Sequence, residues 1–184
     1  ECLLNGAEPI DAGVFRRFLA AGEPFGLRPG AAFPAFGMAE VGIGGSFSQR
    51  WDGFRTDVVV AEVLEHDHVA RMPSEGEERP TRELALLGRP VPGLEMRVVD
   101  RSTGEELGDR QVGELLIRGT SVTPGYYKNP EATAELVVDG WLHTGDLAYL
   151  LDGELVVCGR IKDVIIVGGR NIYPQDVERS ASEV

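Results

Sequence analysis

The chain has 184 residues, 42% of them hydrophobic, which is enough for one domain or for two unequal pieces of a larger one. Its formal net charge of −12 excludes nonspecific binding to nucleic acid or to an anionic membrane, because long-range repulsion would oppose both. With two distant cysteines, Cys2 and Cys158, and no apolar run of roughly 18 residues, the composition predicts a reduced, cytoplasmic protein without a zinc site or a membrane span.

The first half of the sequence predicts a helix, a short apolar strand and a glycine-rich loop. Residues 9–21 place apolar side chains on one helical face, with Pro9 in the first turn and Gly22 at the stop. The apolar positions of this face are Ile10, Val14, Phe15, Phe18 and Leu19. The apolar run 32–36 then leads into five glycines between Gly37 and Gly53, where the backbone either turns repeatedly or approaches another group closely. Residues 65–87 are polar and charged, which predicts a long surface excursion.

From Gly88 onward, short β-like runs follow one another at hairpin spacing. The runs are 94–100, 113–119, 141–151, 153–159 and 164–167. The runs 113–119 and 153–159 have similar sequences, and we interpret them as two strands of one small sheet or barrel, because two copies are too few for a repeat protein. Residues Val164 to Val167 are interpreted as a core strand, and Pro174 as the first residue of a final helix.

Two stretches in the first half have residue types that suit nucleotide binding. Residues 5–9, NGAEP, form a tight turn whose exposed backbone can lie along a flat ring, although a plain loop before the helix has the same sequence pattern. In residues 36–40, FGMAE, Phe36 offers a stacking face, Gly37 permits close approach and Glu40 offers oxygen to Mg²⁺ beside a phosphate. The alternative for this second stretch is a buried Phe and a solvated Glu.

Two residues in the second half suit binding of a sugar. Asp146 follows Gly145 at a turn between apolar runs, where a carboxylate either accepts the hydroxyls of a ribose or hydrogen-bonds its own turn. The guanidinium of Arg160 suits phosphate or sugar oxygens, and one strand pair would bring it to the same end of a sheet as Asp146. P-loop, dinucleotide-binding and nucleophile-elbow motifs are missing, and His66-Asp67-His68 is interpreted as solvated rather than metal-binding.

Taken in order, FGMAE, GWLHTGD and GRIKDVIIVGGRNIYPQDVE resemble the motifs of the adenylate-forming superfamily of acyl-CoA synthetases, adenylation domains and luciferases. NGAEP, Ala39 and VGGRNIYPQDVE are most similar to fatty acyl-AMP ligases. The resemblance implies an α/β fragment of that fold, with the end of an α/β subdomain and its surface excursion in 1–87. It also implies a distorted β-barrel in 88–159, and a hinge with the first strand and helix of a small C-terminal domain in 160–184. The family's upstream phosphate loop and C-terminal catalytic lysine are missing, so we expect a piece of a longer enzyme that is inactive alone.

The resemblance implies ATP-dependent activation of a fatty acid to an acyl-adenylate and pyrophosphate, followed by acyl transfer to acyl-carrier-protein phosphopantetheine or to CoA. ATP and Mg²⁺ are the implied cofactors. Glu40 is implied as the catalytic Mg²⁺ ligand and Lys162 as the hinge residue. The implied nucleotide-binding residues are Gly6, Ala7, Glu8, Phe36, Gly37, Met38, Ala39, Asp146 and Arg160. Phe36 stands where Tyr is usual and Ala39 where Thr is commoner, so each lacks a hydroxyl. The alternative is a noncatalytic nucleotide-binding or docking module, either a fragment or a degenerate paralogue.

Overall fold

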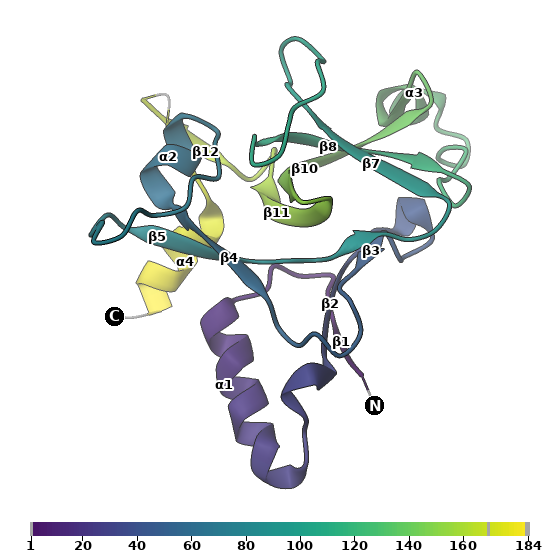
Figure 1. Ribbon diagram of the computed structural model, residues 1–184. Coiled ribbons are helices and arrows are strands. Elements are labelled where there is room, and N and C mark those ends of the chain that lie inside the picture. Colours follow the sequence, from purple (N-terminus) through teal and green to yellow (C-terminus); the bar gives the residue numbers. More distant parts are fainter. Residues whose placement is uncertain (1, 169, 183–184) are drawn as a thin grey trace.

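The computed structural model describes residues 2–168 and 170–182, an α/β chain with a small N-terminal sheet, a larger curled sheet and a C-terminal hairpin (Figure 1). The N-terminal sheet has the order β1-β2-β3-β6. Its strands are β1 (Leu3–Asn5), β2 (Ala32–Phe36), β3 (Ser46–Phe47) and β6 (Arg89–Pro90). β1 and β2 are parallel, whereas β2, β3 and β6 are antiparallel neighbours.

Helix α1 (Ala12–Gly22) starts later than the sequence predicts. The side chain of Asp11 caps it by accepting a 2.6 Å hydrogen bond from the amide of Val14, and Asp is among the preferred N-cap residues, so Pro9 remains outside the helix. The predicted apolar face is also too wide, because Val14 and Phe18 are 54% and 53% exposed. Only the flank with Phe15 is buried, where its ring meets Phe54 edge to face at 4.8 Å.

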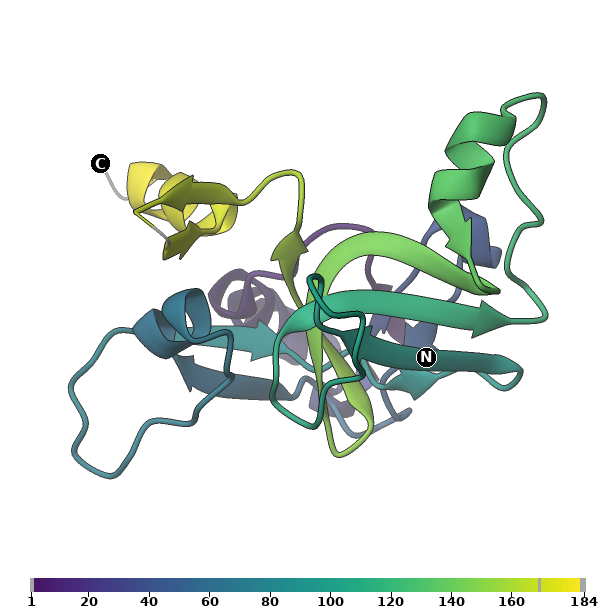
Figure 2. The same cartoon turned by 90° about the horizontal axis from the view of Figure 1, so that it is seen from above.

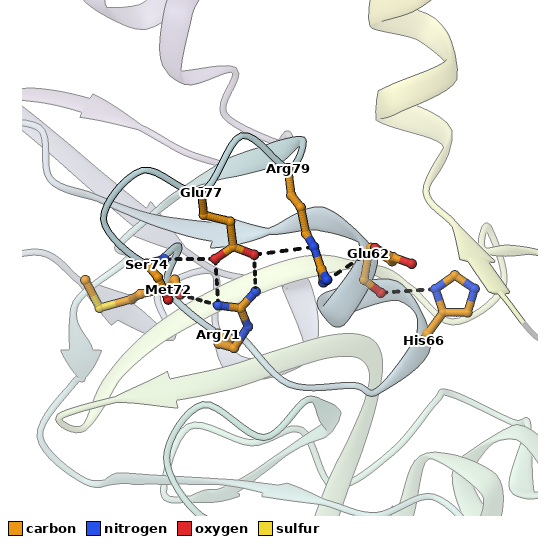
Figure 3. Close-up of polar contacts among 7 residues, drawn as sticks. All are labelled: Glu62, His66, Arg71, Met72, Ser74, Glu77 and Arg79. Atoms are coloured by element: carbon orange, nitrogen blue, oxygen red, sulfur yellow. Dashed lines mark hydrogen bonds and ion pairs between the residues drawn. The ribbon is translucent and has the colours of Figure 1, made fainter.

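The predicted surface excursion is wrong in its last part. Strand β4 (Thr56–Val60) and helix α2 (Ala61–His66) are followed by a loop, and β5 (Thr81–Ala85) then returns antiparallel to β4. This pairing buries residues 84–87, and Ala70 is also fully buried, so the surface part of the predicted excursion is the loop 71–80. Figure 3 shows how Glu77 orders that loop: it accepts two hydrogen bonds from Arg71 (2.9 and 2.6 Å) and one from the amide of Ser74.

The larger sheet is a curled half-barrel with the strand order β11-β10-β8-β7 (Figure 2). Its strands are β7 (Leu94–Val99), β8 (Gly113–Gly119), β10 (Trp141–Leu151) and β11 (Glu154–Arg160), with β9 (Val137–Val138) paired to β10. The two runs of similar sequence, β8 and β11, flank β10, which confirms that they are strands of one sheet. Helix α3 (Pro130–Leu136) is capped by Asn129 and precedes β9.

The chain ends in a hairpin of β12 (Ile165–Val167) and β13 (Arg170–Ile172), followed by α4 (Pro174–Ser182). Pro174 takes the predicted first position of the helix, and Gly169 lies outside the described residues. The prediction of a core strand is wrong, because residues 165–167 are 50%, 68% and 57% exposed and only Val164 packs against the core. A two-stranded hairpin has no second layer of its own, so its apolar side chains stay at the surface.

The part of the chain that the structure describes also contains three short 3₁₀ helices: η1 (Glu23–Phe25), η2 (Pro29–Ala31) and η3 (Ala39–Val41). Over the described residues, every helix is too short or too polar to cross a bilayer.

Candidate functional site

The parallel pairing of β1 with β2 brings the NGAEP turn and the FGMAE loop together. Asn5 lies opposite Pro34, so both strands end at the same edge and their loops leave side by side. A Cβ on Gly6 would lie 2.7 Å from the carbonyl oxygen of Ala35, so the two backbones approach too closely for any larger residue. Ala7 has a left-handed φ of 72°, and Gly6, Ala7 and Glu8 are all exposed. The edge therefore presents an accessible strip of backbone.

The FGMAE loop folds back on itself. A Cβ on Gly37 would overlap the carbonyl oxygen of Ile43, and a Cβ on Gly45 would lie 3.0 Å from the Phe36 ring. These close approaches explain the glycine-rich sequence, as predicted. Phe36 and Met38 are half-buried and pack against the core cluster that contains Leu142 and Ala148 of β10. Ala39, at the start of η3, is exposed.

Glu40, in η3, is held by a distant loop, and this contact was not predicted from the sequence. Its Oε1 accepts a 2.7 Å hydrogen bond from Tyr126 Oη, and its backbone oxygen accepts one from the amide of Thr123 at 2.7 Å. The hydrogen bond to Glu40 raises the pKa of Tyr126. Within the described part of the chain, Glu40 forms no ion pair, so its carboxylate charge is not neutralised by a basic side chain.

This carboxylate fits Mg²⁺, which usually binds proteins through one or two carboxylates and completes its shell with water and substrate phosphates. Residues 2–168 and 170–182 contain no cluster of three or more His, Cys, Asp or Glu, as a cage made only of protein ligands would need. A single carboxylate of this kind fits a magnesium ion whose other ligands are water and substrate phosphate.

Strands β10 and β11 bring Asp146 and Arg160 together, as predicted, at the point where β11 ends against the middle of β10. The two residues are register partners, and Nε of Arg160 donates a 3.2 Å hydrogen bond to Oδ1 of Asp146. Asp146 is only 4% exposed, but the side chain of Arg160 is 64% exposed. The pairing of β10 with β8 shifts register between His143 and Leu147, and Gly145 has a φ of +71° within this irregular segment.

The electrostatics around Asp146 are dominated by burial, which raises the pKa of its carboxyl. Arg160 opposes this shift, whereas the nearby carboxylates of Asp163 and Glu114 add to it. The hydroxyl of Thr144 accepts a 3.0 Å hydrogen bond from the Asp146 amide and donates one of 2.8 Å to the Leu115 carbonyl. A buried acceptor with raised pKa beside an exposed guanidinium is suited to bind ligand hydroxyl groups.

Lys162 lies apart from these groups. It is exposed in the turn 161–163 between β11 and the C-terminal hairpin, where the amides of Asp163 and Val164 both donate to the Arg160 carbonyl. Figure 2 shows that this turn joins the curled sheet to a C-terminal segment that stands to one side of it. His66 and His68 also lie apart, and their Nδ1 atoms are 3.1 Å from the Glu62 carbonyl oxygen and 3.4 Å from Asn171 Nδ2.

Comparison with known proteins gives consistent matches. The family model for AMP-binding enzymes matches residues 1–127. The chain is 45% identical to Rv1013 of Mycobacterium tuberculosis, over 98% of this chain and 33% of that protein. It is 37% identical to the medium-chain-fatty-acid–[acyl-carrier-protein] ligase JamA of Moorena producens, over 95% of this chain and 31% of that protein. A solved structure from work on fatty acyl-adenylate ligases of E. coli and L. pneumophila superposes with a TM-score of 0.93 at 35% identity, over 100% of this chain and 33% of that chain. The chain thus spans about a third of the length of these proteins.

Proposed function

Since the chain belongs to the family of AMP-binding enzymes, we propose that it is part of an enzyme that activates a fatty acid with ATP, forming an acyl-adenylate and pyrophosphate. The observation that carries this proposal is the pairing of buried Asp146 with Arg160 where the β10–β11 ladder ends. The names of JamA and of the superposed ligases support a fatty acid as the substrate.

In this proposal, the nucleoside half of ATP is held between the two sheets. Asp146 accepts hydrogen bonds from the ribose hydroxyls, and Arg160, by pairing with the carboxylate, opposes the rise in its pKa that burial causes. The exposed backbone of Gly6, Ala7 and Glu8 lies along the adenine. Phe36 packs near the base, and the backbone of Gly37, Met38 and Ala39 follows the nucleotide toward its phosphates.

Glu40 is the proposed ligand for Mg²⁺, which when bound neutralises charge on the phosphates. The carboxylate of the fatty acid attacks the α-phosphate and pyrophosphate leaves, so the residues of this chain orient the nucleotide and none acts as a nucleophile. The Phe36 ring and the Ala39 methyl group donate no hydrogen bonds, so contacts to the phosphates here come from backbone groups.

For the second half of the reaction, we propose that the acyl group passes to the phosphopantetheine thiol of an acyl-carrier protein or of CoA. JamA, whose name includes the carrier protein, supports the first acceptor. The domain boundaries proposed are 1–87, 88–159 and 160–184, with Lys162 at the pivot between the last two. Its exposed position in a turn that joins two separate sheets supports this role.

The test is exchange of labelled pyrophosphate into ATP by the full-length gene product, given Mg²⁺ and fatty acids of several chain lengths. We expect exchange with at least one fatty acid, its loss in Asp146→Ala, and its retention in Asp139→Ala, a control in the exposed turn between β9 and β10. Absence of exchange at every chain length, with an acyl-adenylate analogue still bound, would instead favour the noncatalytic nucleotide-binding module.

A further inference from the structure

We propose that Tyr126 is a positioning residue for Glu40, orienting its carboxylate toward the magnesium–nucleotide; this inference rests on the proposed function. The loop 120–129 connects β8 to α3 and reaches Glu40 from 86 positions further along the chain. It binds Glu40 twice, through the Tyr126 hydroxyl to Oε1 and through the Thr123 amide to the backbone oxygen, each at 2.7 Å. Both the backbone and the carboxylate of Glu40 are therefore fixed from one loop.

Tyr126 is itself anchored to the start of α3. Its amide donates a 2.9 Å hydrogen bond to Thr133 Oγ1, and that hydroxyl donates one of 2.7 Å to the Asn129 carbonyl. A Cβ on Gly125 would overlap the methyl group of Thr133, so the loop packs tightly against the helix at this point. The Tyr126 ring consequently starts from a fixed backbone, which is what a positioning group needs.

The geometry leaves Glu40 able to bind a cation. The Tyr126 hydroxyl donates to Oε1, and it therefore restricts the rotation of the carboxylate while Oε2 stays available. Mg²⁺ requires near-ideal octahedral geometry, so a single protein carboxylate must be well oriented if it is to contribute. Outer-shell hydrogen bonds to metal ligands commonly change metal affinity about 10- to 100-fold.

The adjacent residue provides a matched control. Tyr127 has the same side chain but is 88% exposed, and its ring lies against the ammonium of Lys128 at 5.2 Å instead of reaching Glu40. Tyr127→Phe therefore removes an equivalent hydroxyl from the same loop without touching the carboxylate.

The experiment measures binding of α,β-methylene-ATP to the full-length protein by calorimetry at a series of Mg²⁺ concentrations. We expect Tyr126→Phe to raise the half-saturating Mg²⁺ concentration about tenfold, as loss of an outer-shell partner does. Tyr127→Phe is expected to leave it unchanged. Both variants should match the wild type in two further measurements: binding of a nonhydrolysable acyl-adenylate analogue without metal, and the thermal unfolding temperature. If Tyr126 had a purely structural role, its substitution would lower both the affinity for the analogue and the unfolding temperature.

A double-mutant cycle separates action through Glu40 from any independent effect. Glu40→Gln alone should make binding of the nucleotide analogue depend less on Mg²⁺. Adding Tyr126→Phe to Glu40→Gln should have no further effect. The role of Tyr126 would be overturned if Tyr126→Phe left the Mg²⁺ dependence of nucleotide binding unchanged, or if it weakened that binding equally in the Glu40→Gln background. Either result would leave the proposed function standing. Failure of the wild type to bind the acyl-adenylate analogue would overturn the proposed function, and this inference with it.

Discussion

At the scale of single residues, Asp146 occupies a position that opposes folding. It is 4% exposed, and its one side-chain partner among the described residues is the largely exposed Arg160. Burial disfavours the ionised carboxylate and raises its pKa. A buried carboxylate whose ionised form is disfavoured by burial is better explained by ligand binding than by stability.

Asp146→Asn should therefore separate stability from binding. Because the folded protein raises the pKa above its ordinary value of 3.8, this residue favours folding most below that value, and the contribution is lost as pH rises through the folded pKa. The variant should melt at the same or a higher temperature than the wild type, with a larger gain at about pH 8 than at about pH 5. Acyl-adenylate analogue binding should weaken about 10- to 100-fold, because a hydrogen bond to a charged group contributes roughly 1.5–3 kcal/mol.

Calorimetry and thermal unfolding of the same samples measure both effects, and Glu40→Ala without Mg²⁺ is the comparison for binding. We expect a smaller loss of analogue binding at Glu40 under these conditions. A lower melting temperature combined with unchanged binding in Asp146→Asn would contradict the assignment to the ribose.

Glu77 shows the opposite shift. Arg71 and the Ser74 amide hold the pKa of Glu77 at about 2, below its ordinary value of 4.5 (Figure 3). The depressed pKa means that Glu77 orders the loop above pH 4.5 and ceases to do so as pH falls toward about 2. Glu77→Gln should thus speed trypsin cleavage after Arg71 at neutral pH, with Glu75→Gln as the control in the same loop. Equal cleavage of the two variants would show that this ion pair does not order the loop.

At the scale of elements, the strands of the curled sheet were predictable from the sequence, and the exposure of individual segments was not. The runs that became β7, β8, β10 and β11 are short apolar stretches between turn residues, which is a local signal. Burial of β5 depends on pairing with β4, a distant segment, so its charged residues suggested a surface loop. The same limit applies to Ile165–Val167, whose apolar sequence resembles a core strand but has no layer packed on it.

The site divides in the same way. The juxtaposition of Asp146 and Arg160 was predictable, because one strand pair can bring them together, and the structure has them as register partners. The contact between Tyr126 and Glu40 was not predicted, because nothing near Tyr126 in the sequence indicates a partner 86 positions away.

The irregular part of β10 can be tested with glycine substitutions. Gly145 and Gly140 have left-handed φ values of 71° and 79°, and a Cβ would meet no atom within 4 Å at either position. Alanine at either site should thus cost a similar roughly 1–2 kcal/mol of backbone strain, measured by denaturant unfolding. Only Gly145→Ala should also weaken binding of the acyl-adenylate analogue, because this residue precedes Asp146. Equal binding by both variants would mean that the local backbone at Gly145 does not position the carboxylate.

At the scale of the whole molecule, the segment beyond Lys162 contacts the core through Val164 and Tyr173. Tyr173 is fully buried in the core cluster that contains Leu64 and Tyr149, and the guanidinium of Arg82 lies 4.2 Å from its ring centroid. The exposed apolar residues 165–167 contribute little to this attachment. Of the two side chains Val164 and Tyr173, Tyr173 is the fully buried one, so it is the one to test for docking of the segment beyond Lys162.

Tyr173→Ala should release this segment without unfolding the curled sheet. The substitution removes the ring from its socket, whereas Ile166→Ala, at a position 68% exposed, removes a side chain that packs on little and serves as the control. Hydrogen exchange should become faster in β12 and β13 of the Tyr173 variant and stay unchanged in β8 and β10, because local opening follows the contacts that hold each unit. If the segment turns about Lys162 between the two half-reactions, the substitution should also affect these reactions unequally. In the full-length Tyr173 variant, the rate of acyl-adenylate formation should fall more, relative to wild type, than the rate of acyl transfer. Unchanged exchange in β12 and β13 would mean that contacts other than Tyr173 hold the segment in place.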